Sequence, residues 1–195
     1  MIIVVVMWQP HLSTANADGV TTQITLYAHT DTSATSFGGK VLSLSRNATS
    51  RQSADVRDGL EFTLTPPLSS ELIVLSVDTY VWLVSRESVR GTLQVAISEV
   101  TANASVREIR SASVTIAVPT NPYQVQFGFG PAKYTVTAGS SIRFAVRFSP
   151  VRPVPVSLLW DDASTQTRLV LEAEAIPRID LTVTDIHNRV STIFV

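Results

Sequence analysis

The chain contains no cysteine and few residues of either charge. Without cysteine, neither disulfide bonds nor thiolate metal sites can form, although 195 residues are enough to bury a large core without them. Charged residues make up only 16% of the chain, and the formal net charge is -1. No long-range field therefore attracts nucleic acid or anionic lipid, and we expect no nucleic-acid partner.

Catalytic motifs are also missing. Only three histidines occur, and there is no G-x-S-x-G or H-E-x-x-H motif. Glu172 and Glu174 are two residues apart on an expected strand, which separates them by about 7 Å, near the spacing of a glycosidase pair. Because Arg168 shares their face, a solvated surface with an ion pair is the favoured interpretation. We predict no catalytic residues and no enzymatic activity.

Residues 1–17 carry no charge, and the first charged residue is Asp18. The apolar run at residues 2–7 is far shorter than the roughly 20 residues that cross a bilayer, so no transmembrane span is expected. Ala15 and Ala17 form an A-x-A arrangement typical of the end of a secretory signal. Two interpretations stay open: a signal remnant, or a strand of the mature protein. Together with two glycosylation-type sequons, the first predicts a secreted or cell-surface protein.

What the sequence does contain is alternation of apolar and polar residues at period two, which is typical of strands with one face in a core. No window of a dozen residues repeats apolar groups at helical spacing. The predicted fold class is all-β, an antiparallel two-sheet jelly-roll β-sandwich. The expected strands lie at residues 24–28, 41–44, 60–64, 93–97, 114–118, 125–129, 142–148, 154–158, 169–173 and 179–183.

Two further segments, residues 72–75 and 80–84, are apolar on both faces and are expected to be central strands covered on both sides, or strands whose outer face meets a partner. We expect residues 18–175 to form one sandwich after the N-terminal segment. Residues 176–195 are expected to form a hairpin that completes the sandwich or begins a further module, because two strands are not stable alone.

Five stretches give the middle of the chain a recognisable order: Phe62-Thr-Leu-Thr-Pro-Pro-Leu-Ser-Ser-Glu-Leu72, Tyr80-Val-Trp-Leu83, Gly91-Thr-Leu-Gln-Val-Ala-Ile97, Tyr134-Thr-Val-Thr-Ala-Gly-Ser-Ser-Ile-Arg-Phe144 and Leu158-Leu-Trp-Asp-Asp-Ala-Ser164. This order resembles secreted prokaryotic jelly-roll modules with a galactose-binding-like architecture, as in the C-terminal domain of X-Pro dipeptidyl-peptidase-like hydrolases. The resemblance covers residues 21–173 as a pattern and brings no ligand motif. It implies a two-sheet sandwich with an accessory, non-catalytic role.

The candidate ligand-binding residues are Tyr80, Trp82 and Trp160, since exposed aromatic rings stack on sugars. For Tyr80 and Trp82, core packing is the favoured interpretation, because Val81 and Leu83 are apolar too.

Calcium is the one cofactor considered. Asp161 and Asp162 follow an expected strand, and Asp55 and Asp58 lie in a loop that could approach them. The alternative is that the adjacent aspartates simply form a turn.

The remaining class of function is assembly. Ile2, Ile3, Val4, Val5 and Val6 form an apolar, charge-free segment suited to pairing with an open sheet edge, as in donor-strand filaments. The apolar end at residues 192–195 is a second segment of this kind. We predict a structural or interaction role through self-association of terminal strands. The alternative is a carbohydrate-binding accessory module with a glycan partner.

Overall fold

The computed structural model describes residues 21–31, 39–46, 50–131 and 133–174, and the strands at 181–184 and 190–193. The described residues form fourteen strands and no α-helix, which confirms the all-β prediction. None of them forms a helix able to span a membrane. The expected leader and the apolar segment from Ile2 to Val6 lie outside the described residues, as does the end of the chain at 194–195.

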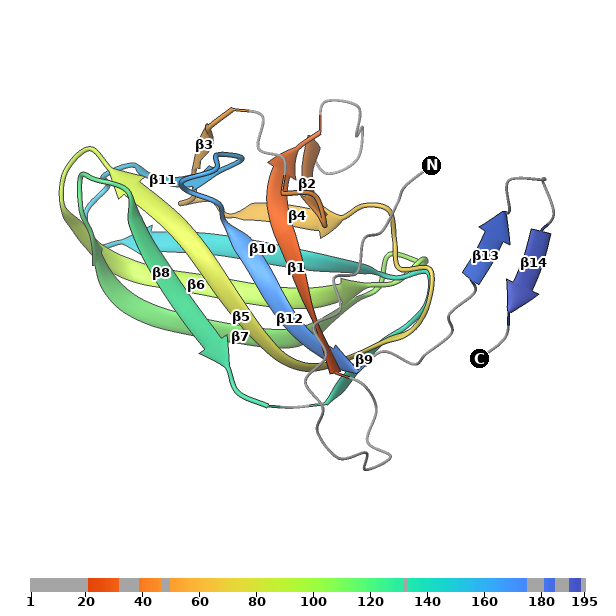
Figure 1. The fold of residues 1–195 in the computed structure, drawn as a ribbon. Helices are drawn as coiled ribbons and strands as arrows, with labels where there is room; N and C mark the ends of the chain where they lie inside the picture. The colour runs from red at the N-terminus through yellow and green to blue at the C-terminus, as the bar shows by residue number, and fades with distance from the viewer. Residues whose placement is uncertain are drawn as a thin grey trace, which may run out of the picture.

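Twelve strands are hydrogen-bonded into one mixed sheet (Figure 1). Their bounds are β1 Thr21–Thr30, β2 Lys40–Ser43, β3 Gln52–Asp55, β4 Leu60–Leu64, β5 Leu72–Ser85, β6 Val89–Val100, β7 Val106–Val118, β8 Tyr123–Phe129, β9 Tyr134–Val136, β10 Ser141–Pro150, β11 Val156–Trp160 and β12 Arg168–Glu174. The main path runs β3-β11-β5-β12-β1-β2-β4-β10-β6-β7, and β8 and β9 pair with β5 off this path.

β5 is the central strand of the sheet. The two apolar segments predicted at 72–75 and 80–84 are one continuous strand of 14 residues. β12 and β11 pair along one edge of β5, and β9 and β8 pair along the other. Its inward residues, among them Val77, Val81 and Leu83, are buried. This one strand therefore holds four others in register.

One pair of neighbours departs from the predicted antiparallel pattern. β2 lies parallel to β4, with Val41 beside Thr63 and Leu42 beside Leu64. The prediction of a purely antiparallel arrangement was wrong here because the chain between β2 and β4 includes β3, which pairs with β11 elsewhere in the sheet. Parallel neighbours need such a long crossover, whereas a tight turn makes them antiparallel.

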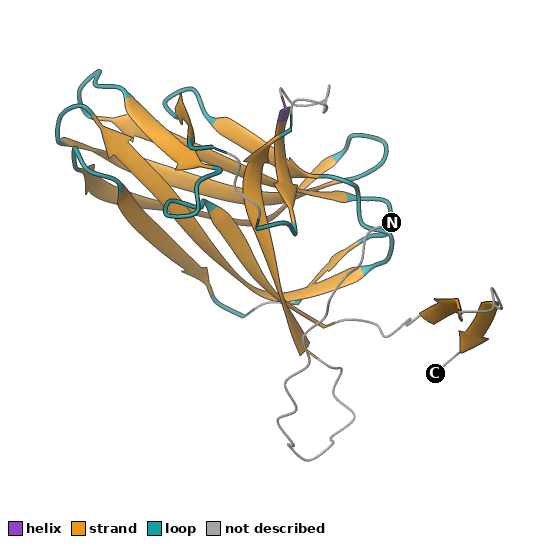
Figure 2. Ribbon diagram, turned by 45° about the horizontal axis from the view of Figure 1, so that its top comes forward, coloured by secondary structure: helices purple, strands orange, loops and turns teal. Residues whose placement is uncertain are grey.

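The sheet curls so that its inward faces pack on each other (Figure 2). Phe62 of β4 meets Trp160 of β11 edge-on, with ring centroids 5.4 Å apart, although the two strands share no pairing. The largest fully buried side chains come from eight strands on this path: Phe62, Phe144, Phe148, Leu26, Leu42, Leu83, Leu93, Ile97, Ile142, Leu158, Leu169 and Leu171. One continuous core thus joins strands that are distant along the sheet.

The hairpin expected within residues 176–195 corresponds to a separate two-stranded sheet. β13 (Leu181–Thr184) pairs antiparallel with β14 (Val190–Ile193). Neither strand pairs with any described strand of the larger sheet.

Candidate functional site

Two edge strands that follow each other in the chain define one side of the molecule. Among the described strands, β7 pairs only with β6, and β8 pairs only with β5. A short turn at residues 119–122 joins them, and from it the two strands diverge (Figure 1). We call this side the open flank. It consists of the free edges of β7 and β8 and of the inward-facing side chains Val114, Ile116, Tyr123 and Phe127.

Apolar side chains are exposed along the open flank although they face inward. The register of β6 and β7 puts Val114 directly beside the buried Leu93, so both lie on the inner face. Tyr123 likewise lies beside the buried Leu83. Val114 is nevertheless 36% exposed and Tyr123 is 43% exposed. The inner face of the sheet is therefore only partly covered at this flank.

The free edge of β7 is long and uncharged over most of its length. β7 has 13 residues; Arg107, Glu108 and Arg110 lie near its start, and residues 111–118 contain no charge and no proline. Natural sheets usually protect long free edges with charges, proline or short length, because such edges pair with other strands. The edge of β7 lacks these protections over residues 111–118.

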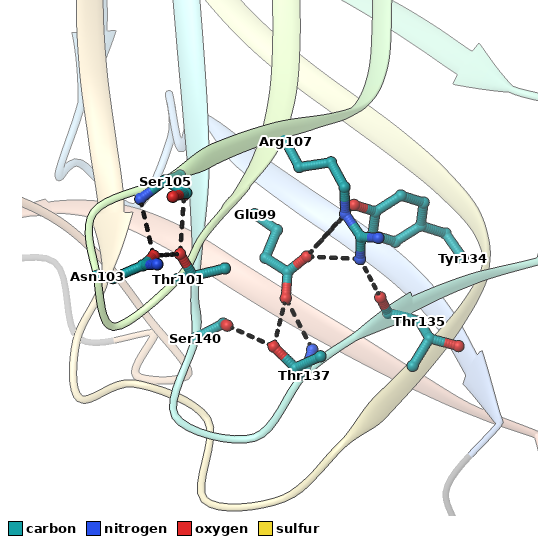
Figure 3. A network of polar contacts seen from close by, with 9 residues as sticks. All are labelled: Glu99, Thr101, Asn103, Ser105, Arg107, Tyr134, Thr135, Thr137 and Ser140. Atoms are coloured by element: carbon teal, nitrogen blue, oxygen red, sulfur yellow. Dashed lines mark hydrogen bonds and ion pairs between the residues drawn. The ribbon is translucent and has the colours of Figure 1, made fainter.

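A buried carboxylate fixes the beginning of β7 (Figure 3). Glu99 of β6 is 1% exposed. Its carboxylate accepts hydrogen bonds from Arg107 Nε and Nη2 at 3.1 and 2.7 Å. It also accepts them from Thr137 N and Oγ1 at 2.8 and 2.7 Å. Because Thr137 lies between β9 and β10, this carboxylate ties three separate parts of the sheet together.

Electrostatics favour the charged form of Glu99. Burial by itself would raise its pKa, but hydrogen bonds from Thr137, Arg107 and Ser140 outweigh burial and lower the pKa to about 2. The Arg107 guanidinium also lies 4.6 Å from the centre of the Tyr134 ring. Glu99 and Arg107 thus neutralise each other within the protein. We infer that this cluster stabilises the fold and does not supply a reactive group.

The turn between β6 and β7 carries one of the two sequons. Asn103 is exposed there, and its Oδ1 accepts a hydrogen bond from Ser105 N at 3.2 Å and one from the Thr101 hydroxyl (Figure 3).

A groove of about 720 Å³ crosses the outer face of β4, β10, β6 and β7. At its centre Ala145 lies beside Ala96, and in the neighbouring row Arg147 lies beside Gln94. The small methyl groups leave the space that the longer side chains border. The remaining lining residues are Asp58, Gly59, Leu60, Glu61, Val95, Ser111, Ala112, Ser113 and Val146.

The groove offers hydrogen bonds and charge but no aromatic ring. Glu61 forms an ion pair with Arg143, whose Nη1 lies 3.1 Å from Oε2 of Glu61. Arg147 is exposed, and no described residue forms a hydrogen bond or ion pair with its side chain. Its guanidinium is therefore available to a ligand.

Tyr80 and Trp82 share the outer face of β5 and are both half-buried. The Arg168 guanidinium lies 4.1 Å from the centre of the Tyr80 ring, and Gln126 Nε2 donates to the Tyr80 hydroxyl at 3.2 Å. The Trp82 indole nitrogen is buried, and no described residue forms a hydrogen bond with it. The structure thus brings the two rings onto one face, directed away from the core, and Arg168 and Gln126 contact the Tyr80 ring and hydroxyl.

Trp160 is on the opposite face. Its neighbour Leu159 lies beside Trp82, so the side chain of Trp160 itself points to the inner side. It is 4% exposed, packs on Phe62, and donates from Nε1 to Thr30 Oγ1 at 3.0 Å. The three predicted aromatic residues therefore do not form one platform.

Asp161 and Asp162 have different partners. Asp161 is buried, and its Oδ1 lies 2.8 Å from Nδ1 of His29. Asp162 accepts hydrogen bonds from Ser164 N at 2.8 Å and from Arg51 Nε at 2.6 Å. The contacts with Ser164 and Arg51 lower the pKa of Asp162. Both carboxylates are thus engaged by the protein itself.

The other two carboxylates of the predicted calcium site do not join them. Asp55 forms an ion pair with Arg57, and Asp58 lines the groove. Among the described residues there is no group of three or more His, Asp or Glu side chains that could hold a metal ion. Calcium binding stays a prediction from the sequence.

Sequence reasoning missed Glu99 and the groove. Glu99 continues the inward series Leu93, Val95 and Ile97, and a charge in an apolar series is a signal of a buried ion pair. The groove had no such signal, because its floor depends on two alanines that meet only through the register of β6 and β10.

Solved structures with a similar fold were found for this chain, although sequence comparisons found no match. No family model and no curated protein matches the sequence. The fold resembles the C-terminal domain of CocE/NonD and X-Pro dipeptidyl-peptidase-like hydrolases, which confirms the resemblance inferred from the sequence. At identities of 8–12%, this likeness concerns the fold alone.

Three of these structures illustrate the match. A CocE/NonD family hydrolase from Staphylococcus aureus aligns with a TM-score of 0.64 and 8% identity, over 80% of this chain and 37% of that one. An aminopeptidase from a marine sediment Thaumarchaeota archaeon gives 0.62 and 10%, with the same coverage. An alpha-amino acid ester hydrolase gives 0.57 and 12%, over 77% of this chain and 36% of that one. The chain thus spans little more than a third of each.

Proposed function

We propose that this chain is a non-catalytic interaction module, secreted or displayed at the cell surface, in which copies associate through terminal strands. The observation that carries the proposal is the open flank. This flank combines the long free edge of β7 with two exposed, inward-facing apolar side chains, Val114 of β7 and Tyr123 of β8. Free edges and exposed apolar side chains together are typical of surfaces that bind another polypeptide.

The fold that supports this role is a two-sheet jelly-roll sandwich. The contact between Phe62 and Trp160 supports a first layer containing β4, β10, β6 and β7, packed on a second containing β11, β5, β12, β1 and β8. The match to about 37% of hydrolase chains supports an accessory rather than a catalytic role.

Deletion of the apolar N-terminal segment tests the proposal. We expect residues 1–195 to form polymers that residues 18–195 do not form, because the deleted segment includes the charge-free residues 2–7. Light scattering and negative-stain microscopy of the two purified proteins measure the difference. Monomers from both, at matched concentration and salt, would contradict the assembly role.

A second candidate function is carbohydrate binding in the groove. It is favoured by the exposed Arg147 beside Gln94, with Asp58 and Glu61 in the same lining, because paired sugar hydroxyls bind carboxylate, amide and guanidinium groups. The groove lacks an aromatic ring, so we expect weak binding that depends on hydrogen bonds.

The groove is tested with a panel of neutral hexasaccharides by isothermal titration calorimetry. If one binds, Arg147→Ala is expected to weaken it about tenfold, since one charged hydrogen bond contributes about 1.5 kcal/mol or more. Arg86→Ala is the matched control, because Arg86 is exposed outside the groove. Binding that survives Arg147→Ala but is lost with Tyr80→Ala would move the site to the outer face of β5.

A further inference from the structure

We infer that the open flank is the acceptor for residues 2–7 of a second copy of the chain, which pair with β7 along residues 111–118. This inference rests on the proposed assembly function and names the surface that carries it.

The first argument is the match of length and charge along the strand edge. Residues 111–118 of β7 offer eight consecutive uncharged positions, and residues 2–7 are six apolar positions without charge. A strand added here meets free backbone N–H and C=O groups, which give affinity with little dependence on sequence. The charged beginning of β7, with Arg107 and Arg110, favours pairing over the second part.

The second argument is burial of apolar surface. In an added strand, alternate side chains face the inner side, next to Val114 and Ile116 of β7, and Tyr123 and Phe127 of β8 are also on the inner face. These positions are now exposed or half-buried. β-branched residues such as Ile3 and Val5 fit this environment, because they pack well on a pleated, half-buried surface. The added strand would thus extend the core at the point where it is incomplete.

The other free edges fit less well. β3 has only four residues and ends at Asp55, which forms an ion pair with Arg57. β9 has three residues. β8 has seven, about half the length of β7, and Pro131 follows it closely. β7 is therefore the preferred acceptor, and β8 is the competitor that the experiment must distinguish.

The distance from the start of β1 to the open flank, measured along β5, favours binding of residues 2–7 to a second copy rather than to their own chain. Thr21 pairs with Glu174, which lies beside Ile73 at the start of β5, whereas Tyr123 lies beside Leu83. Ten strand residues separate these points, which is about 33 Å. A random coil of 13 residues, the number in 8–20, has a typical end-to-end distance of only about 20 Å. Binding to its own flank would require an unusually stretched connection.

The absence of cysteine makes a cross-linking test unambiguous. One preparation carries Val4→Cys and a second carries Thr115→Cys on the outer face of β7; the two are mixed and treated with a short bis-maleimide. We expect a product of twice the 21.1 kDa mass of one chain, at least tenfold more abundant than from a mixture of Val4→Cys with Gln126→Cys on β8.

A second test places a charge at the open flank. Val114→Lys on β7 is expected to abolish polymers, whereas Gln124→Lys on β8 is not.

The outcomes separate this inference from the proposed function. Polymers with cross-linking to Gln126→Cys rather than Thr115→Cys would overturn β7 as the acceptor and leave assembly intact. A third preparation carries Val4→Cys and Thr115→Cys in the same chain. If only this preparation cross-links, and its product has the mass of a monomer, the inference that residues 2–7 bind a second copy of the chain is overturned. Monomers from unmodified residues 1–195 would instead contradict the assembly function itself.

Discussion

Replacing Glu99 with alanine is expected to destabilise the fold by about 3 kcal/mol, because Thr137 loses a buried carboxylate acceptor and each hydrogen bond to a charged group contributes about 1.5 kcal/mol or more. The change leaves Arg107 without its carboxylate partner and removes the acceptor for both the amide and the hydroxyl of Thr137. Urea unfolding followed by fluorescence measures the free energy of unfolding, provided that the slope with denaturant is unchanged.

The matched control for this prediction is Glu108→Ala on the neighbouring strand. Glu108 is exposed and accepts one hydrogen bond, from the Ser111 hydroxyl at 2.7 Å. Its loss is expected to cost less than about 1 kcal/mol, as for other exposed contacts. Equal destabilisation by the two substitutions would contradict the role assigned to the Glu99 cluster.

The pH dependence gives the same prediction an independent readout. The pKa of Glu99 falls from 4.5 to about 2 on folding, so its contribution is fully present above pH 4.5 and is lost as the pH falls toward 2. A shift of this size corresponds to about 3 kcal/mol. The loss of stability between pH 5 and 2 is therefore expected to be smaller in Glu99→Gln than in the unmodified protein.

Replacing Gly91 with alanine is expected to destabilise the fold by about 3 kcal/mol, although it adds only one methyl group. A Cβ at this position of β6 would lie 2.5 Å from Cζ of Phe148 and 2.5 Å from the carbonyl oxygen of Ser149. Phe148 is fully buried, and the oxygen belongs to the backbone of β10, so neither can move freely. Overpacking of this kind costs about 1–3 kcal/mol or more.

Gly130→Ala is the control for Gly91→Ala. Apart from its chain neighbours, no described residue has an atom within 4 Å of a Cβ built on Gly130, so the substitution is expected to change stability by less than about 1 kcal/mol. The two midpoints of urea unfolding can be compared directly. A Gly91→Ala protein as stable as the Gly130→Ala protein would mean that β6 and β10 do not approach each other as closely as described.

The sequence predicted strands wherever apolar and polar residues alternate, as in β4, β6 and β10. It did not predict β9 or β3, because three or four residues are too few to show a clear period and these strands depend on pairing with β5 and β11. The parallel neighbours β2 and β4 were missed for a related reason: strand direction depends on the path of the chain and not on local pattern.

The candidate residues show the same limit. Trp160 was a reasonable ligand-binding candidate by residue type, but its inward position follows from the register of β11 against β5. Asp161 and Asp162 are adjacent in sequence, yet Asp161 contacts His29 and Asp162 contacts Arg51. The backbone has a positive φ of 60° at Asp161, between these two contacts. Alternation predicts which face a residue occupies, whereas its partners come from strands far away in the chain.

The pairing of β1 with β12 has a consequence for how the protein is made. Thr21 lies beside Glu174, so β1 cannot find its partner until the chain has been synthesised as far as the end of β12. β5 must also wait for β8, β11 and β12. Such non-local pairing is slow, in the range of milliseconds to seconds. During that interval the unpaired strands are exposed together, and conditions that delay aggregation should raise the yield of folded protein.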